Sequence, residues 1–180
     1  MAATRAAMTR GRVVLSLALA SLAGGCGFHP LYGDTGATAQ TAGKLSVIYV
    51  EPIPDRLGYE LRNELIDLFD SSGDATQDSY RLHVTIGTKS EGVAVQNNAA
   101  ITRYNDTLSI AYVLTDKKGT LITKGVETGL SAYNVVTSPY ATMIAQRDAD
   151  TNAAVDIAYR IRTDLAVYFA QAENPPPPKK

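Results

Sequence analysis

The sequence predicts an α+β fold: a four-stranded, mostly antiparallel sheet with two helices packed on one face, in the order β-α-β-β-β-α. Three observations support this prediction. A β-branched run precedes an amphipathic helical stretch, three longer runs alternate between apolar and polar residues, and a second helical stretch follows. Because each helix has one apolar side, the simplest packing places both on the same sheet face. The other face is then exposed or free to bind a partner.

The first strand and helix are predicted between Leu45 and Phe69. Residues 45–50 form a β-branched run that ends at the prolines within 51–54, which indicates a strand followed by a break. Asp55 is a suitable N-cap for a helix over residues 56–69. Apolar side chains recur along this helix at Leu57, Leu61, Leu65, Leu68 and Phe69. This stripe is predicted to face the core.

Three strands joined by turns follow. The first covers residues 80–86, and its alternation continues to Val95. The second covers 101–114 and the third covers 121–133. The segments between them, 96–99 and 116–119, carry turn signals, since asparagine and glycine tolerate left-handed backbone. The pattern predicts an antiparallel meander.

A long helix is predicted after Pro139, which is expected to break the chain. The helix starts between Ala141 and Asp150 and ends near Ala172. Its apolar face is made by Ala154, Ile157, Ala158, Ile161, Leu165, Tyr168 and Phe169. On another face, Arg160 lies four residues from both Asp156 and Asp164, a spacing that favours ion pairs. Asp148 and Asp150 are placed near the helix start, where acidic residues suit the helix dipole.

The first 25 residues have the pattern of a secretory signal peptide. Three arginines precede an apolar run of 11 residues, Val13–Ala23, and small residues lead to Cys26. The run is too short to span a bilayer, which needs about 20 apolar residues. The rest of the chain is predicted to form a lipidated tether over 26–43, a single domain over 44–172, and a disordered Pro-rich tail over 173–180.

Cys26 lies where the signal peptide would be cut, which is the layout of a bacterial lipobox. In a lipobox the thiol is acylated and the cysteine becomes the lipid-bearing first residue. Gly27 follows, and the absence of Asp at that position favours the outer membrane. We therefore expect a chain anchored by acyl chains such as palmitate to the periplasmic side of that membrane. The alternative is an ordinary signal peptide with a free cysteine, which is a liability in an oxidising compartment.

Composition excludes several function classes. The whole chain has a net charge of −1, and removal of three signal-peptide arginines makes the mature chain more acidic, at about −4. This balance argues against nucleic-acid binding. One cysteine and two histidines leave little for a metal site. The motifs of common hydrolases, metalloproteases and P-loop enzymes are absent from the sequence. We expect a non-enzyme without a cofactor, apart from the covalent diacylglycerol and acyl lipid on Cys26.

With these elements in order, the sequence resembles the LptE family of LPS-assembly lipoproteins. Four segments carry the resemblance, and they cover nearly all of the mature chain. They are the lipidated start at 26–33, the first-helix motif at 61–65, the central strand at 102–114, and the passage into the last helix at 132–149.

This resemblance implies a fold and a role. LptE proteins have a four-stranded sheet with two helices, as the residue pattern predicts independently. They plug the lumen of the outer-membrane barrel LptD, help it to assemble, and assist delivery of lipopolysaccharide to the outer leaflet. A plug inside a polar barrel lumen would also explain a domain with little net charge and no catalytic motif.

Contact with lipopolysaccharide implies basic side chains, because the ligand carries phosphate. Arg147 falls near a basic position of the family. Arg103 and Lys89 flank the predicted hairpin tip. We take these three residues as contact candidates, against the simpler interpretation that each is a solvated surface charge.

Two other functions stay open at this point. A freestanding periplasmic lipid-binding lipoprotein would carry lipid between membranes and would need a concave apolar pocket between sheet and helices. A lipid-anchored enzyme would need a catalytic constellation that the sequence does not contain.

Overall fold

A computed structural model describes residues 36–75, 79–95 and 101–173. By its internal contacts the chain divides into two units, residues 1–33 and 34–180, and every described residue belongs to the second. The predicted signal peptide, Cys26, the hairpin tip and residues 174–180 of the predicted Pro-rich tail lie outside the described residues, whereas Glu173, predicted to begin that tail, is the last residue of a helix.

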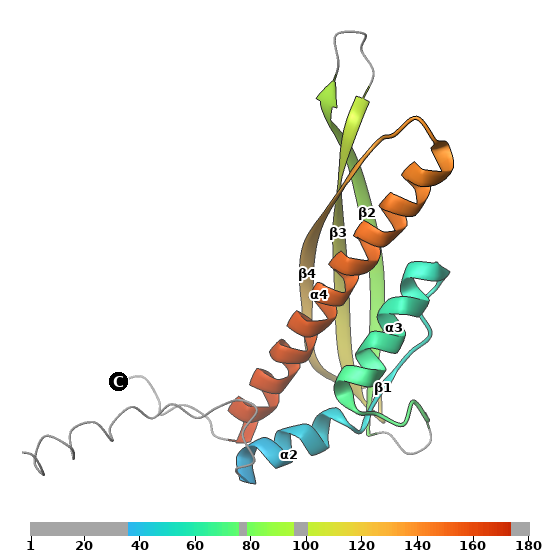
Figure 1. Ribbon diagram of the computed structural model, residues 1–180. Coiled ribbons are helices and arrows are strands. Elements are labelled where there is room, and N and C mark those ends of the chain that lie inside the picture. Colours follow the sequence, from blue (N-terminus) through green and yellow to red (C-terminus); the bar gives the residue numbers. More distant parts are fainter. Residues whose placement is uncertain (1–35, 76–78, 96–100, 174–180) are drawn as a thin grey trace, which may run out of the picture. The chain divides into compact units, whose positions relative to one another are not determined.

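The described elements form one four-stranded sheet with three helices (Figure 1). Strand β1 runs parallel to β2, and β2, β3 and β4 are antiparallel neighbours, so the sheet order is β1-β2-β3-β4. This arrangement confirms the predicted α+β class and its mostly antiparallel sheet. The elements are α2 (Gly36–Leu45), β1 (Ile48–Val50), α3 (Asp55–Phe69), β2 (Tyr80–Val95), β3 (Ile101–Asp116), β4 (Leu121–Asn134) and α4 (Pro139–Glu173).

Helix α2 is the main difference from the prediction, which placed a tether and then the start of a strand in this region. Its glycine, threonine and alanine residues lack a clear apolar stripe. However, Thr41 and Leu45 are buried, and the Lys44 ammonium lies 5.7 Å from the centre of the Phe169 ring. Contacts with α4 therefore stabilise a helix in a segment whose intrinsic helix propensity alone does not predict one.

Helix α3 starts one residue earlier than expected. Asp55 is its first residue, and Pro54 precedes it as the N-cap without a side-chain hydrogen bond, so the capping role predicted for Asp55 is wrong. The predicted apolar stripe is confirmed, because Leu61, Leu65 and Phe69 are buried. The helix packs closely on the preceding loop, since a Cβ at Gly58 would lie 2.9 Å from the Ile53 carbonyl carbon.

The sheet has one covered and one open face. Alternate residues of β2 and β3 are buried beneath the helices: Leu82, Val84, Leu108, Ile110, Tyr112 and Leu114. Figure 1 shows α3 and α4 on this same side of the sheet, as predicted. We call the opposite side the bare face. It carries His83 and Thr85 of β2 together with Val126 and Leu130 of β4, all exposed.

Helix α4 begins at Pro139, earlier than predicted. Proline suits the first turn of a helix, where its missing N–H would have no partner in any case. Residues Ala154, Ile157, Ala158, Ile161, Leu165 and Phe169 are buried, which confirms the predicted core face. The predicted pairs of Arg160 within α4 are wrong: its Nε lies 2.9 Å from Glu127 Oε2 on β4.

Candidate functional site

The three candidate basic residues do not converge on one site. Lys89 and Arg103 belong to the β2–β3 hairpin and, by the strand alternation, face the bare side of the sheet. Arg147 is exposed on α4, which covers the other side. The structure therefore separates Arg147 from the two hairpin residues.

The hairpin residues already have partners. Lys89 Nζ lies 2.6 Å from Glu91 Oε1, and a hydrogen bond to this carboxylate raises the pKa of Lys89. The guanidinium of Arg103 donates to Asn134 Oδ1 at 3.4 Å. By contrast, no described hydrogen bond or ion pair involves the Arg147 guanidinium; the side-chain bond at this residue is one that its backbone carbonyl accepts from Thr151 Oγ1. The Arg147 guanidinium is thus the best placed of the three to receive an anion.

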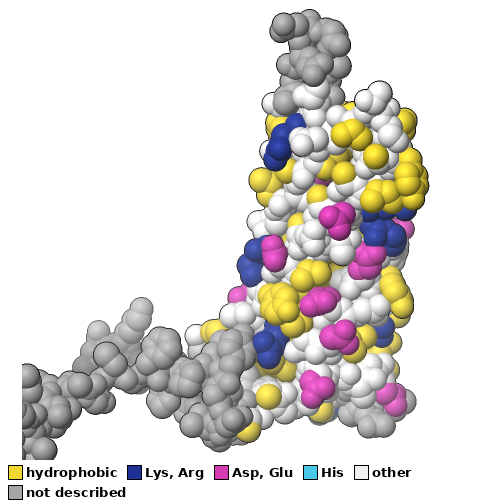
Figure 2. Space-filling view, in the orientation of Figure 1, with side chains coloured by type: hydrophobic (Ala, Val, Ile, Leu, Met, Phe, Trp, Pro, Cys, Tyr) yellow, Lys and Arg dark blue, Asp and Glu magenta, His cyan; other side chains and the backbone are white. Residues whose placement is uncertain are grey.

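Exposed apolar residues gather where β4 leads into α4. We call this group the α4 entry patch: Val135, Val136, Tyr140, Met143 and Ile144. Figure 2 shows apolar side chains clustered at this end of α4. Arg147 lies one helical turn beyond Met143 and Ile144. An apolar patch with an adjacent cation fits a ligand that combines acyl chains with phosphate.

Local hydrogen bonds hold the chain in place at this patch. Ser138 Oγ accepts from the Ala141 amide at 3.4 Å, in the manner of an N-cap. Thr142 Oγ1 accepts from the Val136 amide at 3.0 Å, which ties the loop to the first turn of α4. The patch is therefore displayed on a fixed turn.

A polar cluster lies beneath the same part of α4. Asp106 of β3 is fully buried, and its Oδ2 accepts from Gln146 Nε2 at 3.0 Å, while Oδ1 has no described partner. Beside it, Ser131 donates to Asp150 Oδ1 at 2.6 Å. Because α4 begins at Pro139, Asp148 and Asp150 lie in its third and fourth turns, and the dipole role predicted for them at the helix start is wrong.

Burial raises the pKa of Asp150, and the Asp106 carboxylate adds to this effect. The hydrogen bond from Ser131 and the charge of Arg56 act in the opposite direction. A carboxyl group whose pKa is raised by folding binds its proton more tightly in the native state. The free energy of unfolding therefore falls as the pH rises from the unfolded pKa near 3.8 through the folded pKa, and then levels off.

Substituting Asp150→Asn should remove this pH dependence. The amide keeps a hydrogen bond to Ser131 without a buried charge, so we expect the melting temperature at pH 7 to rise by about 1–4 °C. Thermal unfolding followed by circular dichroism between pH 3 and pH 7 measures the effect. The control is Asp148→Asn, a substitution at an exposed neighbour. Its melting temperature should depend on pH in the same way as that of the wild type. An unchanged profile in the Asp150 variant would contradict the assignment.

The α4 entry patch and the burial of Asp106 were not predicted from the sequence. Five large apolar residues within 135–144, lying outside the predicted core stripe of the last helix, were the available signal for the patch. Asp106 occupies a position that alternation assigns to the covered face, in line with Leu108 and Ile110. An acidic residue in that register was the signal for a buried polar contact.

Within the described residues, His, Cys, Asp and Glu side chains form no group that could hold a metal ion. Among the described helices, none combines the length and apolar character needed to cross a membrane. The features described above are the apolar α4 entry patch, the adjacent Arg147 cation and the bare face of the sheet.

Two solved structures resemble the chain. One is a crystal structure from Caulobacter crescentus CB15, described as a candidate lipoprotein, with 27% identity and a TM-score of 0.61 over 73% of this chain and 97% of that one. The other is rare lipoprotein B from Shewanella oneidensis, with 12% identity and a TM-score of 0.56 over 71% of this chain and 98% of that one. The second likeness supports the fold alone. A comparison with curated proteins finds no match.

The sheet and its helices define the class as an α+β domain, and the structure from Caulobacter crescentus shares this fold. The family model LptE, described as Lipopolysaccharide-assembly, matches residues 45–166. The chain therefore belongs to the LptE lipopolysaccharide-assembly family. Membership confirms the predicted resemblance and a role in assembly rather than catalysis.

Proposed function

We propose that this chain is an outer-membrane lipoprotein, anchored through Cys26, that plugs the lumen of the LptD barrel and assists its assembly. In this role it also helps to deliver lipopolysaccharide to the outer leaflet. The observation that carries the proposal is the family match, which extends from the end of α2 through most of α4.

The surface of the domain supports the proposal. A plug must meet the polar inner wall of a barrel, where lumen-facing side chains are hydrophilic. The bare face offers such a surface, because polar residues such as Thr85 and Thr128 lie on it together with exposed apolar residues such as Val126. An uncovered sheet face of this kind is also consistent with a partner that encloses the domain.

The packing of the domain favours this role over a freestanding lipid carrier. A carrier needs an apolar cavity between sheet and helices. In the described part of the chain this layer is filled by large side chains that are fully buried, including Phe69, Leu108, Ile157 and Leu165. Lipid contact is better placed on the exposed α4 entry patch.

Depletion of the chain tests the proposed assembly role. We expect LptD to accumulate in a form that is incompletely folded, visible as loss of its heat-modifiable band on gels, and lipopolysaccharide to decrease at the cell surface. Depletion of an unrelated outer-membrane lipoprotein is the control. Normal folding of LptD after depletion would overturn the proposal.

Arg147 is the proposed phosphate contact, and its charge reversal provides a test. Arg147→Glu loses a charge-assisted interaction, so we expect the dissociation constant for lipopolysaccharide to rise about 10- to 100-fold. Surface plasmon resonance with the full-length chain in detergent measures this change. Lys117→Glu, an equal charge change in the exposed β3–β4 turn, should alter affinity less than about twofold. Equal affinities for wild type and Arg147→Glu would exclude this contact.

The hairpin residues are proposed as secondary contacts. An anion at Lys89 would compete with Glu91 for the ammonium, and one at Arg103 would compete with Asn134. We therefore expect smaller losses of affinity from their substitution than from Arg147→Glu.

A further inference from the structure

Strand β4 is an edge of the sheet, because it pairs only with β3. The register places the odd-numbered residues of β4 in hydrogen bonds with β3, as the bond from the Val135 amide to the Thr102 carbonyl illustrates. The backbone groups of Thr128, Leu130 and Ala132 therefore point away from the sheet. Such a row of outward N–H and C=O groups can pair with another strand.

A side chain bonds to the outward backbone in one part of this edge, and the next part, which we call the open segment, has no such partner among the described residues. Arg160 Nη2 donates to the Thr128 carbonyl at 2.7 Å, while Arg160 Nε donates to Glu127. The arginine thus occupies the edge at Thr128. Among the described residues, no side chain donates to or accepts from the backbone of Leu130 or Ala132, so the open segment begins directly after this cap.

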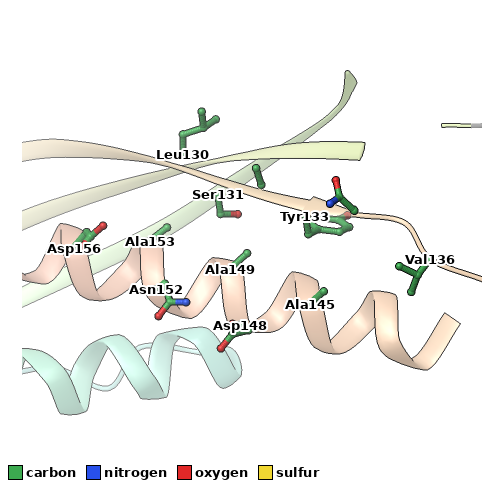
Figure 3. Close-up of a pocket in the computed structure, with 12 residues that line it drawn as sticks. Leu130, Ser131, Tyr133, Val136, Ala145, Asp148, Ala149, Asn152, Ala153 and Asp156 are labelled. Atoms are coloured by element: carbon green, nitrogen blue, oxygen red, sulfur yellow. The ribbon is translucent and has the colours of Figure 1, made fainter. Parts of the chain in front are cut away.

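A groove of about 610 Å³ lies between this open segment and α4. Its floor is formed by residues 130–134 of β4 and by small residues of the helix. Figure 3 shows Ala145, Ala149 and Ala153 pointing toward β4, whereas the Leu130 side chain points away from α4. Small side chains on the helix leave room beside the edge for the backbone and side chains of an added strand.

The outer wall of the groove is acidic. Asp148 and Asp156 both line it and are exposed, no described ion pair involves either, and the lining residues include no Lys or Arg. Eight residues separate the two carboxylates along α4, a distance of about 12 Å. Four residues of an extended strand span about 13 Å, and residues four apart point to the same side. The spacing fits an extended segment with basic residues at positions i and i+4.

From these features we infer that the open edge of β4 binds an extended peptide strand of a partner protein. The strand adds to the sheet at Leu130 and Ala132 by main-chain hydrogen bonds. Two basic side chains, four positions apart on its helix-facing side, meet Asp148 and Asp156. The groove adjoins the bare face at Leu130 and the α4 entry patch at Val136, but the inference rests on the outward backbone of β4 and on two carboxylates that the proposed barrel and lipopolysaccharide contacts do not use.

The test uses the acetylated, amidated heptapeptide TKVTVKT and the full-length chain in detergent micelles. We expect saturable binding with a dissociation constant below about 1 mM, measured by titration of amide NMR signals. Hydrogen exchange at the Leu130 and Ala132 amides should slow at least about tenfold, because these N–H groups become paired. The peptide TEVTVET tests charge. The peptide TKPPVKT tests pairing, because one of its two prolines removes an N–H that would face β4 whether the strand adds antiparallel or parallel. Both peptides should bind at least about tenfold more weakly.

Two variants of the chain separate the components of the site. Asp148→Asn combined with Asp156→Asn should raise the dissociation constant of TKVTVKT about 2- to 10-fold. Ala132→Pro removes one outward N–H, a change that edge strands tolerate, and should abolish the protection of the edge. Asp67→Asn, an exposed substitution on α3, is the matched control and should bind as the wild type.

The following results would overturn the inference. The edge amides could show no protection at saturating peptide, or TKPPVKT could bind as tightly as TKVTVKT. Protection of the same amides that depends on protein concentration without peptide would instead show that a second copy of the chain occupies the edge. If Ala132→Pro does not fold, an unchanged affinity of the double Asp variant would still contradict the assigned acidic wall.

Discussion

Replacing Ile161 with alanine is expected to destabilise the domain by about 2–5 kcal/mol. Ile161 is fully buried in the middle of α4, within the core shared with the sheet and α3. The substitution removes apolar contacts and leaves a cavity that the surrounding helices and sheet fill only partly. Thermal unfolding of the full-length chain in detergent should show a melting temperature lower by roughly 5–20 °C.

The control for this prediction is Val167→Ala on the same helix. Val167 is exposed, so its truncation should change the free energy of unfolding by less than about 0.5 kcal/mol. Similar melting temperatures for the two variants would contradict the burial of the Ile161 face against the sheet.

Replacing Cys26 with alanine is expected to release the chain from the membrane. The thiol is the proposed attachment point of two or more acyl chains, and each buried methylene group contributes about 0.8 kcal/mol to membrane binding. In cells depleted of LptD, where a complex with the barrel cannot retain the chain, fractionation should move the chain from the membrane to the soluble fraction. Labelling with radioactive palmitate should be lost. Thr107→Ala, an exposed substitution in β3, should stay membrane-bound and labelled. An unchanged distribution of the Cys26 variant in LptD-depleted cells, with the palmitate label retained, would refute the lipoprotein anchor.

The strands could be predicted because their signal is local. Alternation of apolar and polar residues along β2 and β3 assigns Leu82 and Leu108 to one face, and both are buried. The turn residues between β3 and β4 act within a few positions as well: Asp116 Oδ1 accepts from the amides of Lys118 and Thr120 at 2.8 Å. Features that depend on neighbouring residues alone are therefore visible in the sequence.

The two helix starts depend on more distant contacts. Helix α2 forms against α4, more than a hundred residues later in the sequence, and its own residues give no helical stripe. Pro139 was interpreted as a break because proline interrupts a helix interior, yet it is acceptable in the first turn. A sequence pattern alone does not tell which of these two positions a proline occupies.

The candidate site was predicted only in part. The phosphate of lipopolysaccharide and the family resemblance predicted Arg147 as a contact, and the structure places this residue beside the α4 entry patch. They also pointed to Lys89, which is paired with Glu91. The i, i+2 spacing of these two residues in a predicted strand was a local signal for this ion pair that the prediction did not use. The groove between β4 and α4 could not be predicted, because it requires knowledge of which strand forms the sheet edge.

The central claim is that this lipoprotein works inside a barrel. The most direct measurement is purification of the tagged full-length chain from outer membranes solubilised in mild detergent, followed by size-exclusion chromatography and mass spectrometry. We predict a stable complex with LptD at a one-to-one ratio, which persists at high salt because the buried interface does not depend on surface charge. Recovery of the chain as a free monomer, with LptD in separate fractions, would contradict the account.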